Sequence, residues 1–178
     1  AREGDIAVFG QRLGDEITLD SWKSRIVSAA PYALVELRAG PLTVTPGLRL
    51  EAFYIEGDRL SPPSKTAPQI GFNRLEWAFD PRLSAQVKAT KWLGFNAGVG
   101  IYHQAPDPRD LSTVFGNPRL ALSTAYHYTA GSSIKLTGTL TLELVGFYKQ
   151  YDNLVSRNAA PTPPLTQALT QDGEGRSY

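Results

Sequence analysis

An uninterrupted alternation of apolar and polar side chains between residues 74 and 89 most constrains what this chain can fold into. One parity of the run is apolar: Leu75, Trp77, Phe79, Pro81, Leu83, Ala85, Val87 and Ala89. Because successive side chains of a β-strand point to opposite faces of a sheet, the run predicts one strand with an apolar face and a charged face. Strands of soluble globular proteins are usually about 5–6 residues long, so the length of this run favours a membrane barrel.

Similar patterns predict the other strands of the same sheet. They fall at 5–11, 31–39, 42–54, 94–103, 119–131 and 136–148, the first of them weak. A strand tilted across a bilayer needs about 9–11 residues in the hydrocarbon, and no window approaches the ~18 consecutive apolar residues of a membrane-spanning helix. We therefore expect an all-β fold: an antiparallel up-and-down transmembrane β-barrel, present as an incomplete segment of about seven strands.

Short and long connections alternate between these strands. Short turns are predicted at 39–41, 91–93 and 131–133, and long connections at 12–30, 57–69, 104–118 and from 152 to the end. Outer-membrane barrels alternate in this way because their periplasmic turns are tight and their extracellular loops are long.

The positions of aromatic residues and prolines agree with this alternation of short turns and long loops. Tyr54, Tyr102 and Tyr148 lie near strand ends and Trp92 lies in a short turn, as in the aromatic girdles of membrane barrels. Most prolines fall in the long connections. Pro46 and Pro81 fall within predicted strands, where proline indicates a bulge near the strand's aqueous end.

The predicted strands are too few to close alone. A single-chain bacterial barrel needs an even number of at least about eight strands, and an open edge exposes unpaired backbone to lipid. The chain also starts at Ala1 and contains no Met. We expect residues 1–178 to be a processed or excised part of a larger barrel; a mature secreted protein after signal cleavage is the alternative.

Several motifs resemble, in order, the barrel of TonB-dependent receptors. They are Thr45-Pro46-Gly47-Leu48-Arg49-Leu50, Pro81-Arg82-Leu83-Ser84, Tyr102-His103-Gln104-Ala105-Pro106, Gly116-Asn117-Pro118-Arg119-Leu120, Gly146-Phe147-Tyr148-Lys149, Tyr151-Asp152-Asn153-Leu154-Val155 and Gly175-Arg176-Ser177-Tyr178. Ala121-Leu122-Ser123 departs from the Pro-Glu pair common in the family. The resemblance covers about 42–178 and implies a barrel of about 22 strands filled by an N-terminal plug, with uptake driven through TonB. Neither the plug nor a TonB box is in this chain.

The polar parity of the strands carries both signs of charge. An Arg or Lys facing lipid near the bilayer midplane costs about 2–4 kcal/mol, so we expect these residues to face a polar lumen and to pair across strands, some of them contacting the plug. They are Arg49, Glu51, Arg74, Glu76, Asp80, Arg82, Gln86, Lys88 and Glu143. Residues in 57–69, 104–118 and 152–177 would form part of an extracellular vestibule. The predicted substrate contacts are Tyr102, Gln104, Arg109 and Asp110.

The sequence gives little support for a catalytic site or a metal site. The chain has no Cys, no Gly-x-Ser-x-Gly motif, and two histidines, His103 and His127, on different predicted strands. We expect lumen or loop histidines, no metal, no cofactor and no enzymatic activity. Gly94, Gly98 and Gly100 share one register; strand curvature is the preferred interpretation and room for a plug or substrate the alternative. With 18 basic and 17 acidic residues, nucleic acid is not an expected partner.

The expected function is energy-dependent uptake of a bulky nutrient, such as an iron chelate, by a receptor in the outer membrane of a Gram-negative type of cell. The expected partners are outer-membrane lipid, the plug of the same receptor, TonB through the missing N-terminal region, and a small-molecule nutrient. Cobalamin and oligosaccharide remain open as substrates. The alternatives are a soluble β-sandwich that binds carbohydrate and a passive outer-membrane porin.

Overall fold

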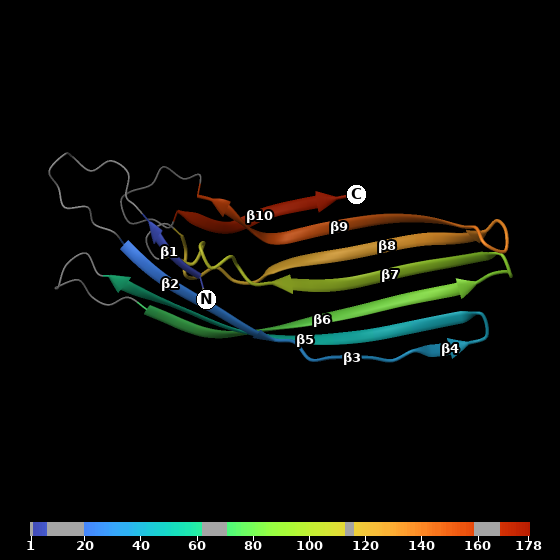
Figure 1. Ribbon diagram of the computed structural model, residues 1–178, viewed down its shortest axis with the longest axis horizontal. Coiled ribbons are helices and arrows are strands. Elements are labelled where there is room, and N and C mark those ends of the chain that lie inside the picture. The colour runs from blue at the N-terminus through green and yellow to red at the C-terminus, as the bar shows by residue number, and fades with distance from the viewer. Residues whose placement is uncertain (1, 7–19, 62–70, 113–115, 159–167) are drawn as a thin grey trace.

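The described part of the chain forms one antiparallel sheet (Figure 1). The computed structural model describes residues 2–6, 20–61, 71–112, 116–158 and 168–178. Its strands are β1 (Arg2–Ile6), β2 (Asp20–Ala29), β3 (Tyr32–Leu34), β4 (Leu37–Ala39), β5 (Leu42–Ser61), β6 (Gly71–Lys88), β7 (Leu93–Gln104), β8 (Ser123–Lys135), β9 (Thr141–Arg157) and β10 (Leu169–Ser177). The sheet order is β1-β2-β5-β6-β7-β8-β9-β10, with β3 and β4 continuing the line of β2 along β5. The all-β, up-and-down architecture is confirmed, and the sheet is not closed.

Two of the three predicted short turns are confirmed. The turn at 39–41 contains Gly40 in the left-handed region, at φ +58°, where glycine is favoured. In the turn before β7, the hydroxyl oxygen of Thr90 accepts hydrogen bonds from the backbone N–H groups of Trp92, at 3.2 Å, and Leu93, at 3.0 Å. Such a hydroxyl cap satisfies donors that the tight turn leaves without strand partners.

The third short turn lies further along the chain than predicted. Residues 131–133 are inside β8, where Gly131 pairs with Val145, and the turn occupies 136–140. There the Leu136 N–H donates to the Leu140 carbonyl at 2.9 Å, and the Thr137 hydroxyl accepts from the Leu140 N–H at 3.1 Å. The predicted strands 119–131 and 136–148 are shifted accordingly, to β8 and β9.

Other predicted boundaries were also wrong, because several strands continue into segments predicted as loops. The predicted connection at 12–30 contains β2, and the one from 152 onward contains the end of β9 and all of β10. β5 continues to Ser61. Pairing with a long neighbouring strand supplies the backbone partners that these more polar segments need, whatever their own periodicity. The weak strand predicted at 5–11 overlaps β1 only at 5–6; the rest lies outside the described residues.

The predicted bulges at Pro46 and Pro81 are absent from the β5–β6 ladder, which pairs residues 42–58 with 71–87 without a register shift. The Val35 N–H donates to the Pro46 carbonyl at 3.0 Å, so the backbone of Pro46 faces the line of β3 and β4. That line is interrupted between Leu34 and Leu37, opposite Pro46. Proline has no backbone N–H to donate, so Pro46 lies where the pairing of β5 with β3 and β4 is interrupted.

Pro81 marks a similar stop on the other side of β6. The Lys88 N–H donates to the Pro41 carbonyl, so even-numbered residues of β6 face β5 and odd-numbered ones face β7. The β6–β7 ladder runs from Lys88↔Gly94 to Arg82↔Gly100 and ends there, one residue before Pro81. Beyond that point β7 pairs only with β8 among the described strands.

The register divides the side chains between two faces, since residues directly opposite in a ladder lie on the same face. One face is apolar and open: Leu75, Trp77 and Phe79 are 55%, 56% and 62% exposed. No second layer covers it among the described strands, so the fold is not a β-sandwich. The other face holds the whole mixed-charge set: Arg49, Glu51, Arg74, Glu76, Asp80, Arg82, Gln86, Lys88 and Glu143. Within the described residues no helix is long and apolar enough to cross a bilayer.

The described residues of the connection between β7 and β8, 105–112 and 116–122, fold onto the polar face at the end of the sheet away from the short turns. We call these residues the strap. Buried strap and strand side chains make the one hydrophobic core cluster identified in the described residues: Phe53, Ile55, Ala78, Leu111, Leu120 and Leu122. Partly buried Ile26, Phe72, Ala105, Val155 and Leu169 pack against it.

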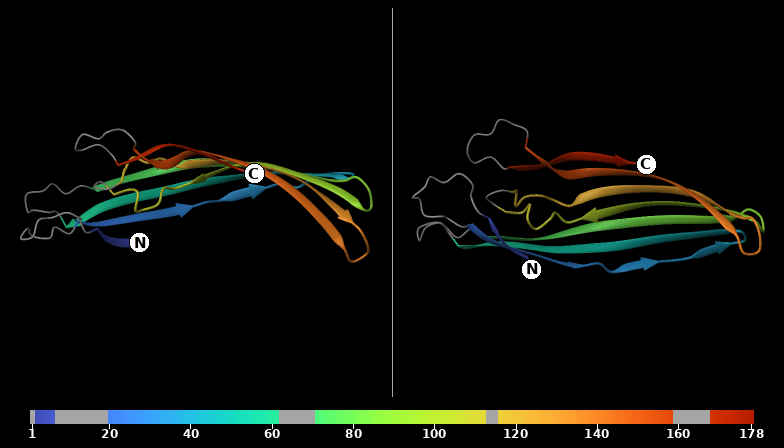
Figure 2. Two further views of the ribbon diagram at one scale, coloured as in Figure 1. Left: turned by 90° about the horizontal axis from the view of Figure 1, so that it is seen from above. Right: turned by 45° about the horizontal axis from the view of Figure 1, so that its top comes forward.

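The strap touches strands near both ends of the sheet order. The Ser24 hydroxyl of β2 donates to the Pro108 carbonyl at 3.0 Å, and the Asn117 side-chain amide donates to the Leu169 carbonyl of β10 at 3.0 Å. A single segment reaches both because the sheet bends around it, as the two views in Figure 2 show. The polar face is therefore the concave one.

Candidate functional site on the concave face

Arg82, Tyr102 and His127 stack across three neighbouring strands of the concave face. The Arg82 guanidinium carbon lies 4.4 Å from the centre of the Tyr102 ring. The centres of the Tyr102 and His127 rings are 4.4 Å apart, and the His127 and Tyr151 rings form a T-shaped pair with centres 6.4 Å apart. A guanidinium over an aromatic face is attracted by the ring quadrupole, so the four strands β6–β9 present one continuous cationic and aromatic surface.

Gly100 makes room for this stack. It pairs with Arg82 on one side and His127 on the other. A Cβ atom at Gly100 would lie 3.0–3.2 Å from atoms of the Tyr102 ring, which folds back over its own strand. At this position the glycine therefore accommodates a neighbouring ring, a role that neither sequence interpretation had anticipated. At Gly94 and Gly98 a Cβ would meet the Ser133 and Thr129 hydroxyls, at 2.8 and 2.9 Å.

Two cavities border this stack. The first, of about 500 Å³, is lined in part by Gly47, Gly98 and Gly100, together with Tyr32, Leu34, Arg49, Arg82 and His127. The second, of about 550 Å³, adjoins the strap and is lined in part by Arg49, Glu51, Asp80, Tyr102, Gln104 and Pro106. Arg49, Arg82 and Tyr102 line both cavities.

Asp80 is the most deeply buried charge of the second cavity. Its side chain is 1% exposed, and its Oδ1 lies 2.7 Å from His103 Nδ1. Its other oxygen, Oδ2, is buried with no hydrogen-bond partner. An unsatisfied carboxylate oxygen is costly to bury, so this cavity favours a hydrogen-bond donor at that position.

Within the mixed-charge set, Arg49 and Arg74 each pair with a glutamate of their own strand, whereas Asp80 of β6 pairs across strands with His103 of β7. Arg49 Nε lies 2.7 Å from Glu51 Oε1, and Arg74 Nε lies 2.7 Å from Glu76 Oε1. Each pair joins residues two apart on one strand, which share a face. The contacts are close ion pairs rather than aligned hydrogen bonds. This leaves the remaining guanidinium nitrogens free to reach other partners.

The four predicted substrate contacts fall into two groups. Tyr102 and Gln104, at the end of β7, line the second cavity. Arg109 and Asp110 lie in the strap's first turn, away from that lining, and Asp107 organises them: its carboxylate accepts from the Arg109 N–H at 2.9 Å and its carbonyl accepts from the Asp110 N–H at 2.9 Å. Burial raises the pKa of the Asp110 carboxyl, and the nearby Asp107 charge raises it further.

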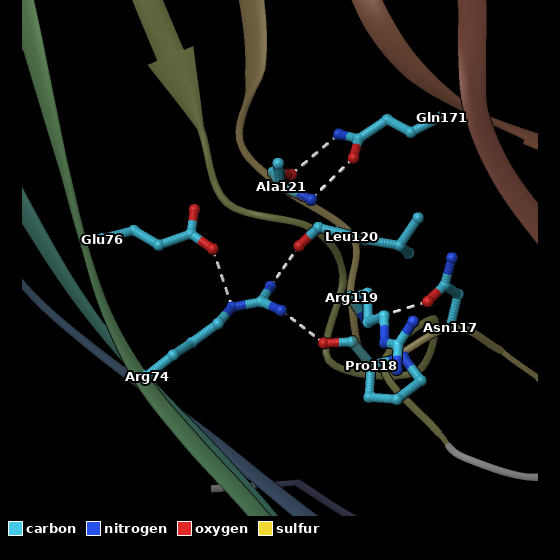
Figure 3. A network of polar contacts seen from close by, with 8 residues as sticks. All are labelled: Arg74, Glu76, Asn117, Pro118, Arg119, Leu120, Ala121 and Gln171. Carbon is cyan, nitrogen blue, oxygen red and sulfur yellow. Dashed lines mark hydrogen bonds and ion pairs between the residues drawn. The ribbon is translucent and has the colours of Figure 1, made fainter.

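Sequence reasoning missed the residues that hold the strap. Arg74 and Gln171 bind its backbone (Figure 3). Asn117 ties it to Leu169 of β10. The alternation placed Arg74 on the lumen face but gave no sign of its contact with the strap, while the motif around Asn117 resembled the end of an external loop. No group of three or more His, Asp or Glu side chains able to hold a metal occurs among the described residues.

A curved antiparallel sheet with an apolar outer face, a charged concave face and an infolded strap defines a segment of β-barrel wall. The chain belongs to the family described as TonB dependent receptor-like, beta-barrel, whose profile matches residues 4–178. The resemblance found in the motifs is thereby confirmed. Members of this family are receptors and transporters of the Gram-negative outer membrane.

The solved structure of a receptor supports the fold. The chain is similar to the ferric-catecholate import receptor Fiu from K12 E. coli in its closed form, with a TM-score of 0.66, 15% identity, and coverage of 90% of this chain and 25% of that one. It also matches the siderophore receptor PirA from Pseudomonas aeruginosa at a TM-score of 0.49 and 15% identity, covering 91% of this chain and 36% of that one. The chain thus spans about a quarter to a third of the receptors it matches. No curated protein matches the sequence.

Proposed function

We propose that this chain is part of an outer-membrane receptor that takes up a bulky nutrient, such as an iron chelate, with energy delivered through TonB. The concave face carries the proposal: it gathers the mixed-charge set on one side of a sheet whose other side is apolar. When further strands close such a sheet, the concave face lines an aqueous lumen and the apolar face meets lipid. Similarity to Fiu, a ferric-catecholate import receptor, motivates the choice of an iron chelate.

In this proposal residues 1–178 supply part of the barrel, while the plug and the remaining strands belong to the rest of the receptor. Tyr102 and Gln104 meet the nutrient from the wall, and Arg109 and Asp110 meet it from the strap. Arg49, Glu51, Arg74, Glu76, Arg82, Lys88 and Glu143 face the lumen, where some contact the plug. TonB acts through the N-terminal region, and no bond of the nutrient is made or broken.

The test is uptake by the full-length receptor, expressed in a Gram-negative strain that lacks its own iron-chelate receptors. Radioactive iron is supplied as catecholate and as hydroxamate chelates, with and without functional TonB. We expect TonB-dependent accumulation of at least one chelate. Entry of every probe at the same rate without TonB would instead identify a passive porin.

A matched set of variants tests the wall contacts. Gln104→Ala, in the second cavity, should raise the KM for the transported chelate by roughly tenfold, the order expected for losing one ligand hydrogen bond. Lys91→Ala, exposed in a short turn at the opposite end of the sheet, should leave KM unchanged. Equal effects of the two substitutions would contradict the proposed position of the binding site.

A further inference from the structure

The strap is packed as a core element and not as a loose external loop. Leu111 and Leu120 are 0% and 1% exposed, and Ser112 is 2% exposed. Within the strap, the Gly116 N–H donates to the Ser112 carbonyl at 2.9 Å, and a Cβ at Gly116 would lie only 2.0 Å from the Asp110 carbonyl oxygen. This contact leaves no space for any other residue at Gly116 unless the backbone moves. The described part of the strap is therefore a compact, specific structure.

Arg74 holds the strap from the wall side (Figure 3). Its two terminal nitrogens donate to the backbone carbonyls of Pro118 and Leu120, while its Nε lies beside the Glu76 carboxylate. The side chain is 22% exposed, so these contacts are largely shielded from water. A planar guanidinium presents several donors in a fixed fork, whereas a lysine ammonium is a single point of charge. Arg74 can thus hold two carbonyls of the strap at once.

Gln171 holds the strap from β10. Its Oε1 accepts from the Ala121 N–H at 2.6 Å, and its Nε2 donates to the Ala121 carbonyl at 2.8 Å. The same amide nitrogen lies 2.9 Å from the Asn153 carbonyl of β9. Backbone groups of the strap that have left the sheet are therefore paired by side chains on both flanks, which meets the requirement that buried backbone groups be satisfied.

We infer that the strap is a fixed part of the barrel wall that narrows the lumen at the end of the sheet away from the short turns, and that Arg74 is its positioning residue. This inference rests on the proposed function in one respect: a narrower lumen affects uptake only if a nutrient passes through it. A loop that swings outward to admit ligand would have to expose Leu111 and Leu120 and break the contacts of Arg74 and Gln171 together. The strap instead stays in place during uptake and supports the wall of the second cavity at Pro106 and Pro108.

The first test measures burial of the strap and requires no ligand. Ser112→Cys is introduced into the full-length receptor on intact cells, and its reaction with a membrane-impermeant maleimide is timed. We expect slow labelling in the parent and labelling faster by roughly tenfold or more with Arg74→Gln, since loss of a charge-assisted hydrogen bond shifts an opening equilibrium by that order. Arg74→Lys, which keeps the charge but not the fork, should fall between them.

Two controls isolate the role of Arg74. Lys88→Gln removes a cation from the same face and strand, far from the strap, and should leave the Ser112→Cys rate unchanged. Arg109→Cys, at an exposed strap position, should label fast in every background. The inference is overturned if Ser112→Cys labels as fast in the parent as in Arg74→Gln.

The second test asks whether the strap moves during uptake. Ala121→Cys and Gln171→Cys are joined with a short bis-maleimide, which replaces the native contact by a covalent one. We expect the rate of chelate uptake to stay within about twofold of the same double variant before cross-linking, since a fixed strap needs no release. Loss of uptake only after cross-linking would show that the strap must open. If no chelate enters through the parent receptor, the proposed nutrient is wrong, whereas the labelling test still decides the state of the strap.

Discussion

The ring of Tyr102 lies 4.4 Å from that of His127, on the neighbouring strand, in space that Gly100 leaves free. The packing of the Tyr102 ring against His127 thus depends on the absence of a side chain at Gly100. The arrangement places an aromatic surface under the Arg82 guanidinium and at the boundary of both cavities.

Substituting Gly100 by Ala should displace the Tyr102 ring. A Cβ at 3.0–3.2 Å from the ring forces it to move, and such overpacking costs about 1–3 kcal/mol of unfolding free energy. Urea unfolding in lipid vesicles measures this cost. Gly138→Ala, where a Cβ meets nothing within 4 Å, is the control and should change stability little. In a double-mutant cycle, Tyr102→Ala should remove most of the Gly100→Ala penalty; full additivity would refute the contact.

The two opposite faces of β6 should tolerate charge very differently. Leu83→Arg places a cation on the apolar face, where a position near the bilayer midplane costs about 2–4 kcal/mol. Gln86→Arg places the same side chain on the concave face and should be close to neutral. The free energy of unfolding in bilayers and the yield of folded receptor in the outer membrane are the measurements. Equal tolerance at both positions would contradict the assignment of the apolar face to lipid.

The strap should become less stable as its acidic turn ionises. Burial and Asp107 raise the pKa of Asp110, so the folded strap favours the protonated carboxyl more than the unfolded chain does. The corresponding stabilisation is complete below the ordinary carboxyl pKa of about 4 and is lost as pH rises through the raised value. Amide hydrogen exchange of strap peptides, corrected for the intrinsic effect of pH, should show protection falling with rising pH. With Asp110→Asn that component of the fall should vanish; an unchanged pH profile would refute the role of Asp110.

Two tryptophans should report different depths in the bilayer. Trp77 lies on the apolar face of β6 and Trp92 in the short turn before β7, 56% and 55% exposed respectively. In variants that keep one of the two and replace the other tryptophans of the receptor by Phe, lipids brominated along the acyl chain should quench Trp77 more strongly. Lipids brominated near the headgroup should quench the fluorescence of Trp92 more strongly, as expected of an aromatic residue at the membrane interface. The reverse order would contradict the proposed position of the short turns at the membrane rim.

The β6 strand shows how much local sequence can determine. Its alternation predicted both faces and nearly both ends, because a strand that separates lipid from water must repeat every two residues. The strands flanking the 136–140 turn were misplaced because Ser132 and Ser133 resemble turn residues, whereas the Thr137 hydroxyl pairs with the turn's N–H groups. β2 and β10 were missed because their backbone partners, and not their own side-chain pattern, make them strands.

The candidate site was predicted only in part, for a related reason. Tyr102 and Gln104 were found because they end a recognisable strand. Arg109 and Asp110 were grouped with them by closeness in sequence, and these two residues are not among those that line the second cavity. The link between Arg74 and residues 118–120 spans more than forty positions, and no local pattern encodes it.

The family, the antiparallel architecture and the side of the sheet on which each β6 charge lies follow from the amino-acid sequence alone, because strand periodicity and motif order are local properties of the chain. The inward fold of the strap, the end of a ladder at Pro81 without a bulge, and the space that Gly100 leaves for the Tyr102 ring are visible only in the folded sheet. These features depend on which backbone groups and side chains come into contact across the sheet. Register and curvature set those contacts, and both are properties of the assembled sheet and not of any single strand.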